Sequence, residues 1–143
     1  MVDAPTIEAC WAAAEWAYEE VEPGIWRSTF ATEREDDFDL YVMLGDGWVH
    51  FAVSPFVHGS DPAARAAYHA ALLAVNQHVR LARFAVDADG DANLLVDLPT
   101  DGFDCAAFVR TLELLVGYTE ALAYELYRVA HEPGYHSPKL PTG

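Results

Sequence analysis

The stretch of residues 80–131 constrains the fold most, because it reads as a β-hairpin followed by one long helix. Two apolar runs, residues 81–86 and 93–98, flank an Asp-rich segment whose Gly90 accepts a positive φ at little steric cost. Apolar and polar side chains alternate within each run. One face of the hairpin is therefore expected to be buried, and the other to remain accessible to water.

The helix expected after Pro99 carries a regular apolar stripe. Its members are spaced alternately four and three residues apart: Phe108, Leu112, Leu115, Thr119, Leu122, Leu126 and Val129. This spacing predicts a helix lying along an apolar surface. A run of about 27 residues spans about 40 Å, which is longer than a small domain needs. Part of the helix is therefore expected to project, to bend near Gly117, or to pack against another subunit.

The rest of the chain predicts elements that extend this sheet and cover it. In order, the predicted elements are a helix over residues 3–22, strands over 25–32, 38–44 and 48–53, a helix over 63–79, the hairpin and the long helix. A five-stranded antiparallel sheet with helices mainly on one face satisfies this order, which places the chain in the α+β class. We expect a single domain over residues 1–131 and an irregular, proline-rich tail over 132–143.

The charge balance limits the partners that the chain can have. Asp and Glu number 23 and Lys and Arg number 8, for a net charge of −15. Such a charge disfavours nucleic acid and anionic membranes as partners, although it can also serve only to keep the protein in solution. No apolar run approaches the roughly 18 residues of a membrane span, and the first residues lack the pattern of a signal peptide. We expect a cytoplasmic protein whose partner, if it is a protein, presents a basic or apolar surface.

No group of residues forms a catalytic, cofactor-binding or metal-binding signature. Cys10 and Cys105 each lie in a predicted helix and are interpreted as buried apolar side chains. The segment from Asp87 to Asn93 resembles the start of an EF-hand loop, but its glycine and its twelfth position do not fit that motif. We interpret it as a turn with clustered carboxylates; the alternative is adventitious binding of calcium. Nucleophile and nucleotide motifs are absent. The six histidines lack metal-ligand spacing: His50, His58, His69, His78, His131 and His136.

The sheet face without helices is the expected site of partner binding. If the even-numbered residues of the second strand, from Phe38 to Leu44, face the helices, then Tyr41 and Met43 face away. Trp48 and His50 join them on the neighbouring strand: the predicted contact residues are Tyr41, Met43, Trp48 and His50. A patch of aromatic and Met side chains suits a dimer or peptide interface. The alternative is scattered surface aromatics, and a register slip of one residue would exchange the two faces.

A homodimer is also expected, with contacts on the alanine-rich middle helix and on the long C-terminal helix. The small side chains of the middle helix let another element approach closely, and the C-terminal helix is longer than the domain needs. The predicted dimer contacts are Ala67, Ala71, Ala74, Tyr118 and Tyr124.

The order of elements and several local sequences resemble the YbjN family, described as bacterial sensory transduction regulators. That family in turn is similar to the class I chaperones of type III secretion. The parts that carry the resemblance are residues 73–77, the Arg83–Phe84 strand, the Asp-Gly turn, residues 94–99 and the long helix after Phe103. The resemblance covers about residues 5–130 and implies a small acidic protein, often dimeric, that binds other polypeptides without doing chemistry on them. Departures are the alanine-rich middle helix, the Trp-rich first half and the proline-rich tail.

The sequence therefore predicts a polypeptide-binding protein, chaperone-like or a regulatory adaptor. Strand addition or docking of a helix in a groove are the expected modes of binding, within an acidic field that steers a basic partner. The alternative is an immunity or antitoxin-like inhibitor whose acidic surface blocks a basic partner. A third reading, a small enzyme or ligand-binding domain, needs a pocket with convergent polar groups that the sequence does not assemble.

Overall fold

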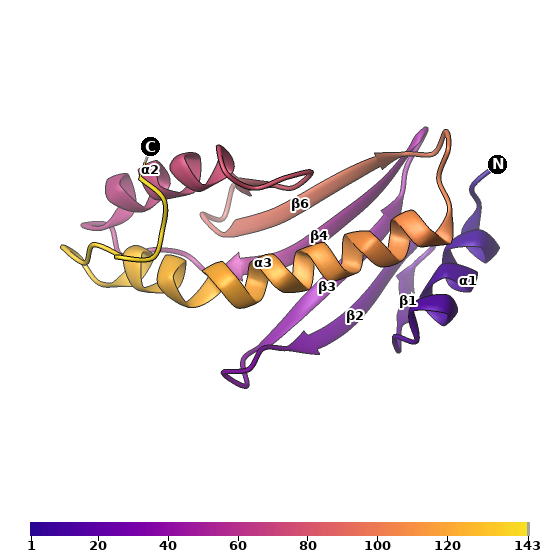
Figure 1. Ribbon diagram of the computed structural model, residues 1–143, viewed down its shortest axis with the longest axis horizontal. Helices are drawn as coiled ribbons and strands as arrows, with labels where there is room; N and C mark the ends of the chain where they lie inside the picture. Colours follow the sequence, from indigo (N-terminus) through magenta and orange to yellow (C-terminus); the bar gives the residue numbers. More distant parts are fainter. Residues whose placement is uncertain (143) are drawn as a thin grey trace.

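The computed structural model describes residues 1–142, which form three helices and one antiparallel sheet of six strands. The elements in order are α1 (Ala4–Ala14), β1 (Glu19–Glu22), β2 (Ile25–Ala31), β3 (Asp37–Leu44), β4 (Trp48–Val57), α2 (Arg65–Asn76), β5 (Arg83–Val86), β6 (Ala92–Pro99) and α3 (Cys105–His131). The strand order across the sheet is β1-β2-β3-β4-β6-β5. Helix α3 crosses the front of the sheet, with α1 and α2 toward its opposite ends (Figure 1).

The core lies between α3 and one face of the sheet. The strand register sets Val42 beside both Trp26 and Phe51, and Phe51 beside Val96, so these side chains form a row across four strands. All of them are essentially inaccessible to water. Phe108 of α3 packs on this row, with its ring centroid 5.4 Å from that of Phe51. Successive side chains of each strand point to opposite faces of the sheet, so this buried row also determines which residues lie on the other face.

The long helix forms as the sequence predicts. It runs for 27 residues, and the carboxylate of Asp104 caps it by accepting a hydrogen bond from the Ala107 N–H at 2.8 Å. The apolar stripe is buried, except that Leu122 is half-buried. Within the part of the chain that the structure describes, neither this helix nor another is long and apolar enough to cross a membrane.

The first helix is shorter than predicted, and the sheet has one strand more. Helix α1 ends at Ala14, and Glu15 takes a left-handed conformation with φ 60°. The chain then turns, and residues 19–22 pair with β2 as β1. Tyr18 and Val21, which continue the helical spacing of the apolar residues of α1, are 40% and 38% exposed. The helical spacing of apolar residues past Ala14 was misleading because strand pairing outweighed it.

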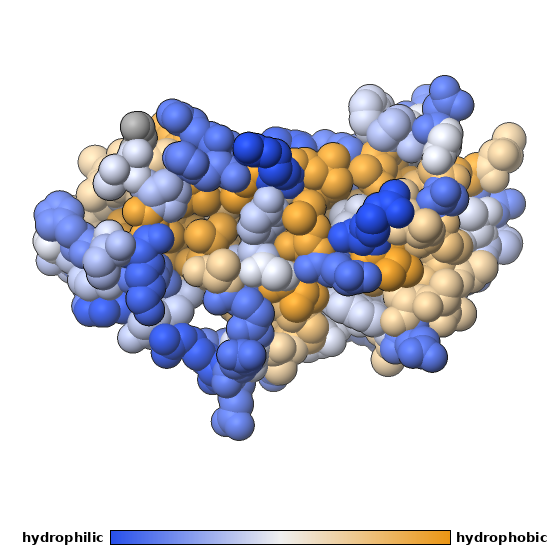
Figure 2. All heavy atoms as spheres, viewed as in Figure 1, coloured by the Kyte–Doolittle hydropathy of each residue, from blue (hydrophilic) through white to orange (hydrophobic). Residues whose placement is uncertain are grey.

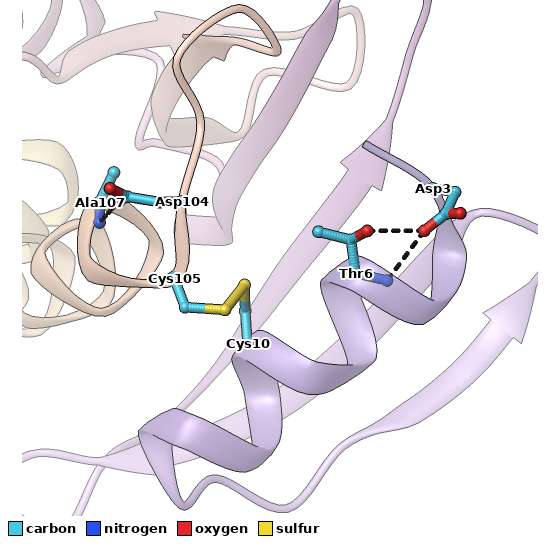
Figure 3. Close-up of a disulfide and its surroundings, with 6 residues drawn as sticks. All are labelled: Asp3, Thr6, Cys10, Asp104, Cys105 and Ala107. Carbon is cyan, nitrogen blue, oxygen red and sulfur yellow. Dashed lines mark hydrogen bonds between the residues drawn. A yellow bond between two sulfur atoms is a disulfide. The ribbon is translucent and has the colours of Figure 1, made fainter. Parts of the chain in front are cut away.

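The interpretation of the two cysteines as unpaired buried side chains is wrong. Cys10 of α1 and Cys105 at the start of α3 form a disulfide bond across 95 positions of sequence. Figure 3 shows the bond running from the second half of α1 to the start of α3, beside the Asp104 cap; Asp3, which accepts hydrogen bonds from Thr6, caps the far end of α1. Two cysteines in separate helices give no local signal of pairing. Only the packing of α1 beside α3 brings them together.

Helix α2 and the tail also differ in detail from expectation. The helix runs over Arg65–Asn76, shorter than the predicted 63–79, and Asp61 accepts a bond from the Ala63 N–H in the turn before it. Beyond α3 the chain forms no further helix or strand over residues 132–142. It nevertheless packs on the core through Tyr135 and Leu140.

Candidate functional site

The sheet face opposite the helices carries two rows of side chains that no described helix covers. The register creates these rows by placing Met43 beside His50 and Tyr41 beside Ala52. The first row is Ile25, Met43, His50 and Asp97, and the second is Arg27, Tyr41, Ala52, Leu95 and Arg83. Together with Trp48, these residues are called the open face below. The four residues that the sequence predicts for partner contact therefore lie on one face.

The centre of the open face is apolar. Met43 is 42% exposed, and Trp48, the first residue of β4, which pairs with Pro99 at the end of β6, is 46% exposed. Tyr41, Ala52 and Leu95 are half-buried between their neighbours on adjacent strands. Exposed Met and Trp side chains at this density on a sheet face are typical of a binding surface, because burying them on a partner removes apolar area from water.

Charged pairs border this apolar centre. His50 Nδ1 lies 2.6 Å from Asp97 Oδ1, and Arg83 donates to the other carboxylate oxygen at 2.8 Å. Partial burial raises the pKa of Asp97, but the hydrogen bond to His50 and the Arg83 pair outweigh it, so the pKa lies below the usual value. At the other border, Arg27 pairs with Glu19. These pairs hold the surrounding side chains in place.

The ring of His50 also depends on Gly45. A Cβ atom at this position would lie 2.9 Å from His50 Nε2, closer than real Cβ contacts. Gly45 therefore makes room for the imidazole that bonds Asp97. The sequence placed His50, Asp97 and Arg83 away from the core by alternation, but it gave no sign that they meet.

The two edges of the sheet differ. At the β5 edge, the Asn76 side chain accepts a hydrogen bond from the Phe84 N–H at 2.7 Å and donates one to its C=O at 3.2 Å. One side-chain amide thus takes the place of a neighbouring strand and seals this edge. At the opposite edge, all four residues of β1 are exposed, and three of them are glutamates.

A concave surface adjoins the β1 edge. Strand β1 pairs only with residues 25–27 of β2. Residues 28–31 pair with β3 on one side, but no strand of the described chain pairs with them on the other. A cavity of about 580 Å³ lies there, lined among others by Trp16, Tyr18 and Phe30. The exposed edge and the aromatic lining together provide room for an added extended segment.

The predicted dimer contacts lie elsewhere. Ala67, Ala71 and Ala74 line a cavity of about 250 Å³ together with tail residues, and Ala74 is buried. The tail therefore occupies part of the alanine face. Tyr118 accepts a hydrogen bond from the Arg80 N–H at 2.6 Å, and the Arg34 guanidinium stacks over Tyr124 at 3.6 Å. A homodimer through these residues stays a prediction.

The Asp-rich turn uses its carboxylates internally. Asp87 accepts hydrogen bonds from the backbone of Asp89 and Asp91 and from the Asn93 side chain. These bonds lower the pKa of Asp87, with the Asn93 bond contributing most. Within residues 1–142, no three His, Cys, Asp or Glu side chains are grouped as a metal site requires.

Comparison with protein families decides the relationship. The model of the YbjN family, described as "Putative bacterial sensory transduction regulator", matches residues 3–127. This chain belongs to the YbjN family. A search of curated proteins found no significant match.

Solved structures show where this YbjN-family fold recurs. A chain of the HopA1–SchA chaperone–effector complex aligns with a TM-score of 0.59 at 9% identity, covering 84% of this chain and 91% of that one. A chain of the heterodimeric ExoU–SpcU complex from the type III secretion system of Pseudomonas aeruginosa aligns with a TM-score of 0.58 at 18% identity, covering 89% and 98%. The predicted α+β fold of the type III secretion chaperone kind is therefore confirmed, with six strands in place of five.

Proposed function

We propose that this protein binds a segment of a partner polypeptide on the open face, as a chaperone-like protein or a regulatory adaptor. The observation that carries the proposal is the exposure of Met43 and Trp48 in a sheet face that no described helix covers. The similar solved chains come from complexes named for a chaperone with its effector, HopA1–SchA, and for ExoU–SpcU. These similarities support a role in binding a polypeptide, but they do not identify which residues of this chain take part.

The charge of the chain supports a basic or mixed partner segment. The net charge is −15, and the β1 edge beside the open face carries Glu19, Glu20 and Glu22. A carboxylate field of this kind speeds the approach of a basic segment and disfavours acidic competitors. The apolar centre then supplies contact area once the segment has arrived. In this proposal an extended segment adds to the β1 edge, because the Asn76 amide occupies the β5 edge.

The test is capture of a partner from native cell extract by the tagged protein, with the double variant Trp48→Ala/Tyr41→Ala as the comparison. A matched control is Leu73→Ala, which removes an apolar side chain that is 68% exposed on α2. We expect the wild type and the control to retain one polypeptide that the double variant loses. The captured polypeptide, purified, is then titrated by calorimetry. If the double variant binds the captured polypeptide with the affinity of the wild type, the open face is not the binding site.

The alternative function is an acidic inhibitor of a basic partner, of the immunity or antitoxin kind. The excess of carboxylates, 23 against 8 basic residues, favours it. In that case the partner stays bound to Trp48→Ala/Tyr41→Ala, and reversing the charge of the β1 glutamates to lysine releases it. Loss of the partner by Trp48→Ala/Tyr41→Ala thus indicates the chaperone-like function. Retention by that variant together with loss by the charge-reversed β1 variant indicates the inhibitor.

We further propose self-association through the alanine face of α2. Its test is light scattering coupled to size exclusion, with Ala71→Glu as the disrupting variant. A charged side chain there would face the partner copy across a close contact. A wild-type protein that elutes as a monomer at all concentrations would refute the homodimer.

A further inference from the structure

A second concave surface lies on the side of the sheet that the helices cover. It forms where the connection from α2 to β5 passes α3, and its volume is about 580 Å³. Leu81 of this connection and Leu98 of β6 line one side of it, and Ala107 and Leu114 line it from α3. We call it the arginine groove, after two further lining residues, Arg80 and Arg110; the lining is completed by Thr111 and Glu113. Figure 2, viewed from this side, shows hydrophobic residues gathered in a band that strongly polar residues interrupt.

Leu81 is held in the groove at an energetic cost. Its φ is 66°, in the left-handed region that β-carbon-bearing side chains avoid, and its side chain is 59% exposed. The residue before it is tied to α3, because the Arg80 N–H donates to the Tyr118 hydroxyl at 2.6 Å. The strained residue presents a large apolar side chain to water, and strained residues of this kind cluster at ligand-binding sites.

The groove also concentrates unpaired positive charge in an acidic molecule. Of the 8 basic residues, Arg27, Arg83 and Arg128 form ion pairs with carboxylates. The other five form none within residues 1–142, and two of these five, Arg80 and Arg110, line the groove. Glu113 is the single acidic residue among those that line the groove. The Arg80 guanidinium donates one hydrogen bond, to the His78 carbonyl at 3.4 Å, and neither guanidinium has a carboxylate partner. Beside the exposed Leu81 and the half-buried Leu98 and Leu114, they match a ligand that carries carboxylates next to an apolar side chain.

We infer that the arginine groove binds an acidic–apolar segment of a partner polypeptide. A leucine-type side chain of the segment packs between Leu81, Leu98 and Leu114, and flanking Glu or Asp carboxylates accept hydrogen bonds from Arg80 and Arg110. The rest of the surface repels such a segment because of its net charge, so the groove is the place where it binds. This site lies on the face opposite the open face, and it does not depend on the proposed function of that face.

The test uses three fluorescein-labelled helical peptides and fluorescence anisotropy. The first peptide places Leu one helical turn apart between Glu residues, the second replaces each Glu by Gln, and the third replaces each Leu by Ala. The variants are Arg80→Glu/Arg110→Glu and Leu81→Gly, with Arg65→Glu and Leu73→Ala as controls that change the same residue types away from the groove. Because charged hydrogen bonds contribute strongly, we expect the double charge reversal to weaken binding of the Glu/Leu peptide by about tenfold or more.

Leu81→Gly separates binding from folding. Glycine adopts a φ of 66° without strain, so thermal stability is expected to hold while binding of the Glu/Leu peptide falls. The inference is overturned if the Gln/Leu or Glu/Ala peptide binds as tightly as the Glu/Leu peptide, or if the Arg80→Glu/Arg110→Glu variant retains it. It is also overturned if the wild type shows no binding at concentrations on the order of 1 mM.

Discussion

Cys10 and Cys105 are joined by a disulfide bond, with their Cα atoms 4.8 Å apart at a sequence separation of 95. Cys10 is completely buried in α1, and Cys105 is the first residue of α3. The bond therefore fastens the first helix to the helix that crosses the sheet. It also encloses every strand within one covalent loop.

Reduction of this bond is expected to destabilise the protein. Closing a loop of this length lowers the entropy of the unfolded chain, which corresponds to roughly 4–5 kcal/mol of stability. We expect the midpoint of thermal unfolding to fall when a reductant is added. The control is Cys10→Ala/Cys105→Ala, which should unfold at one temperature with or without reductant. An unchanged midpoint for the reduced wild type would contradict the prediction.

Asp97 is expected to make stability depend on pH in the acid range. Its pKa in the folded state is lowered below the unfolded value, so its charged form stabilises the fold at neutral pH. That contribution is present above the unfolded pKa of about 4 and disappears as the pH falls through the folded value. Asp97→Asn should therefore lower the free energy of unfolding at pH 7 and reduce its decrease between pH 5 and pH 3, measured by chemical denaturation. Asp101→Asn, an exposed residue in the β6–α3 turn, is the control and should leave both unchanged.

Glu125 is expected to hold the tail against α3. Its carboxylate accepts hydrogen bonds from the Tyr135 hydroxyl and the Ser137 hydroxyl, each at 2.6 Å, and the residue is only 6% exposed. Tyr135→Phe removes one charged hydrogen bond and should lower stability by roughly 1.5–3 kcal/mol. The tail should also become a faster target in limited proteolysis. Tyr127→Phe, at a position 53% exposed, serves as the control. Equal cleavage rates in both variants would show that the bond does not hold the tail.

Asn76 is expected to protect the β5 edge from pairing with other chains. Asn76→Ala leaves the N–H and C=O of Phe84 without their side-chain partners, which should cost about 1–3 kcal/mol. The exposed edge should also promote association, observed as higher-mass species in light scattering. Gln77→Ala changes the exposed neighbouring residue and should do neither. A monodisperse Asn76→Ala protein of unchanged stability would refute the edge role.

Much of the fold and of the open face followed from periodicity. The four–three spacing predicted α3, and alternation placed Tyr41, Met43, Trp48 and His50 on one face, because both patterns are properties of the backbone geometry. The same reasoning failed at residues 15–22. There the apolar spacing continues as in a helix, but pairing with β2 makes residues 19–22 a strand.

The sequence by itself determined the order of elements, the long helix, the Asp-Gly hairpin and the charge of the surface, because each depends on residues close together in the chain. Only the tertiary structure decided the Cys10–Cys105 bond, the burial of Glu125 under the tail and the convergence of Arg80 with Arg110. Each of these needs groups that are far apart in sequence to meet in space. Such meetings depend on how α3 packs across the sheet, and local spacing carries no information about them.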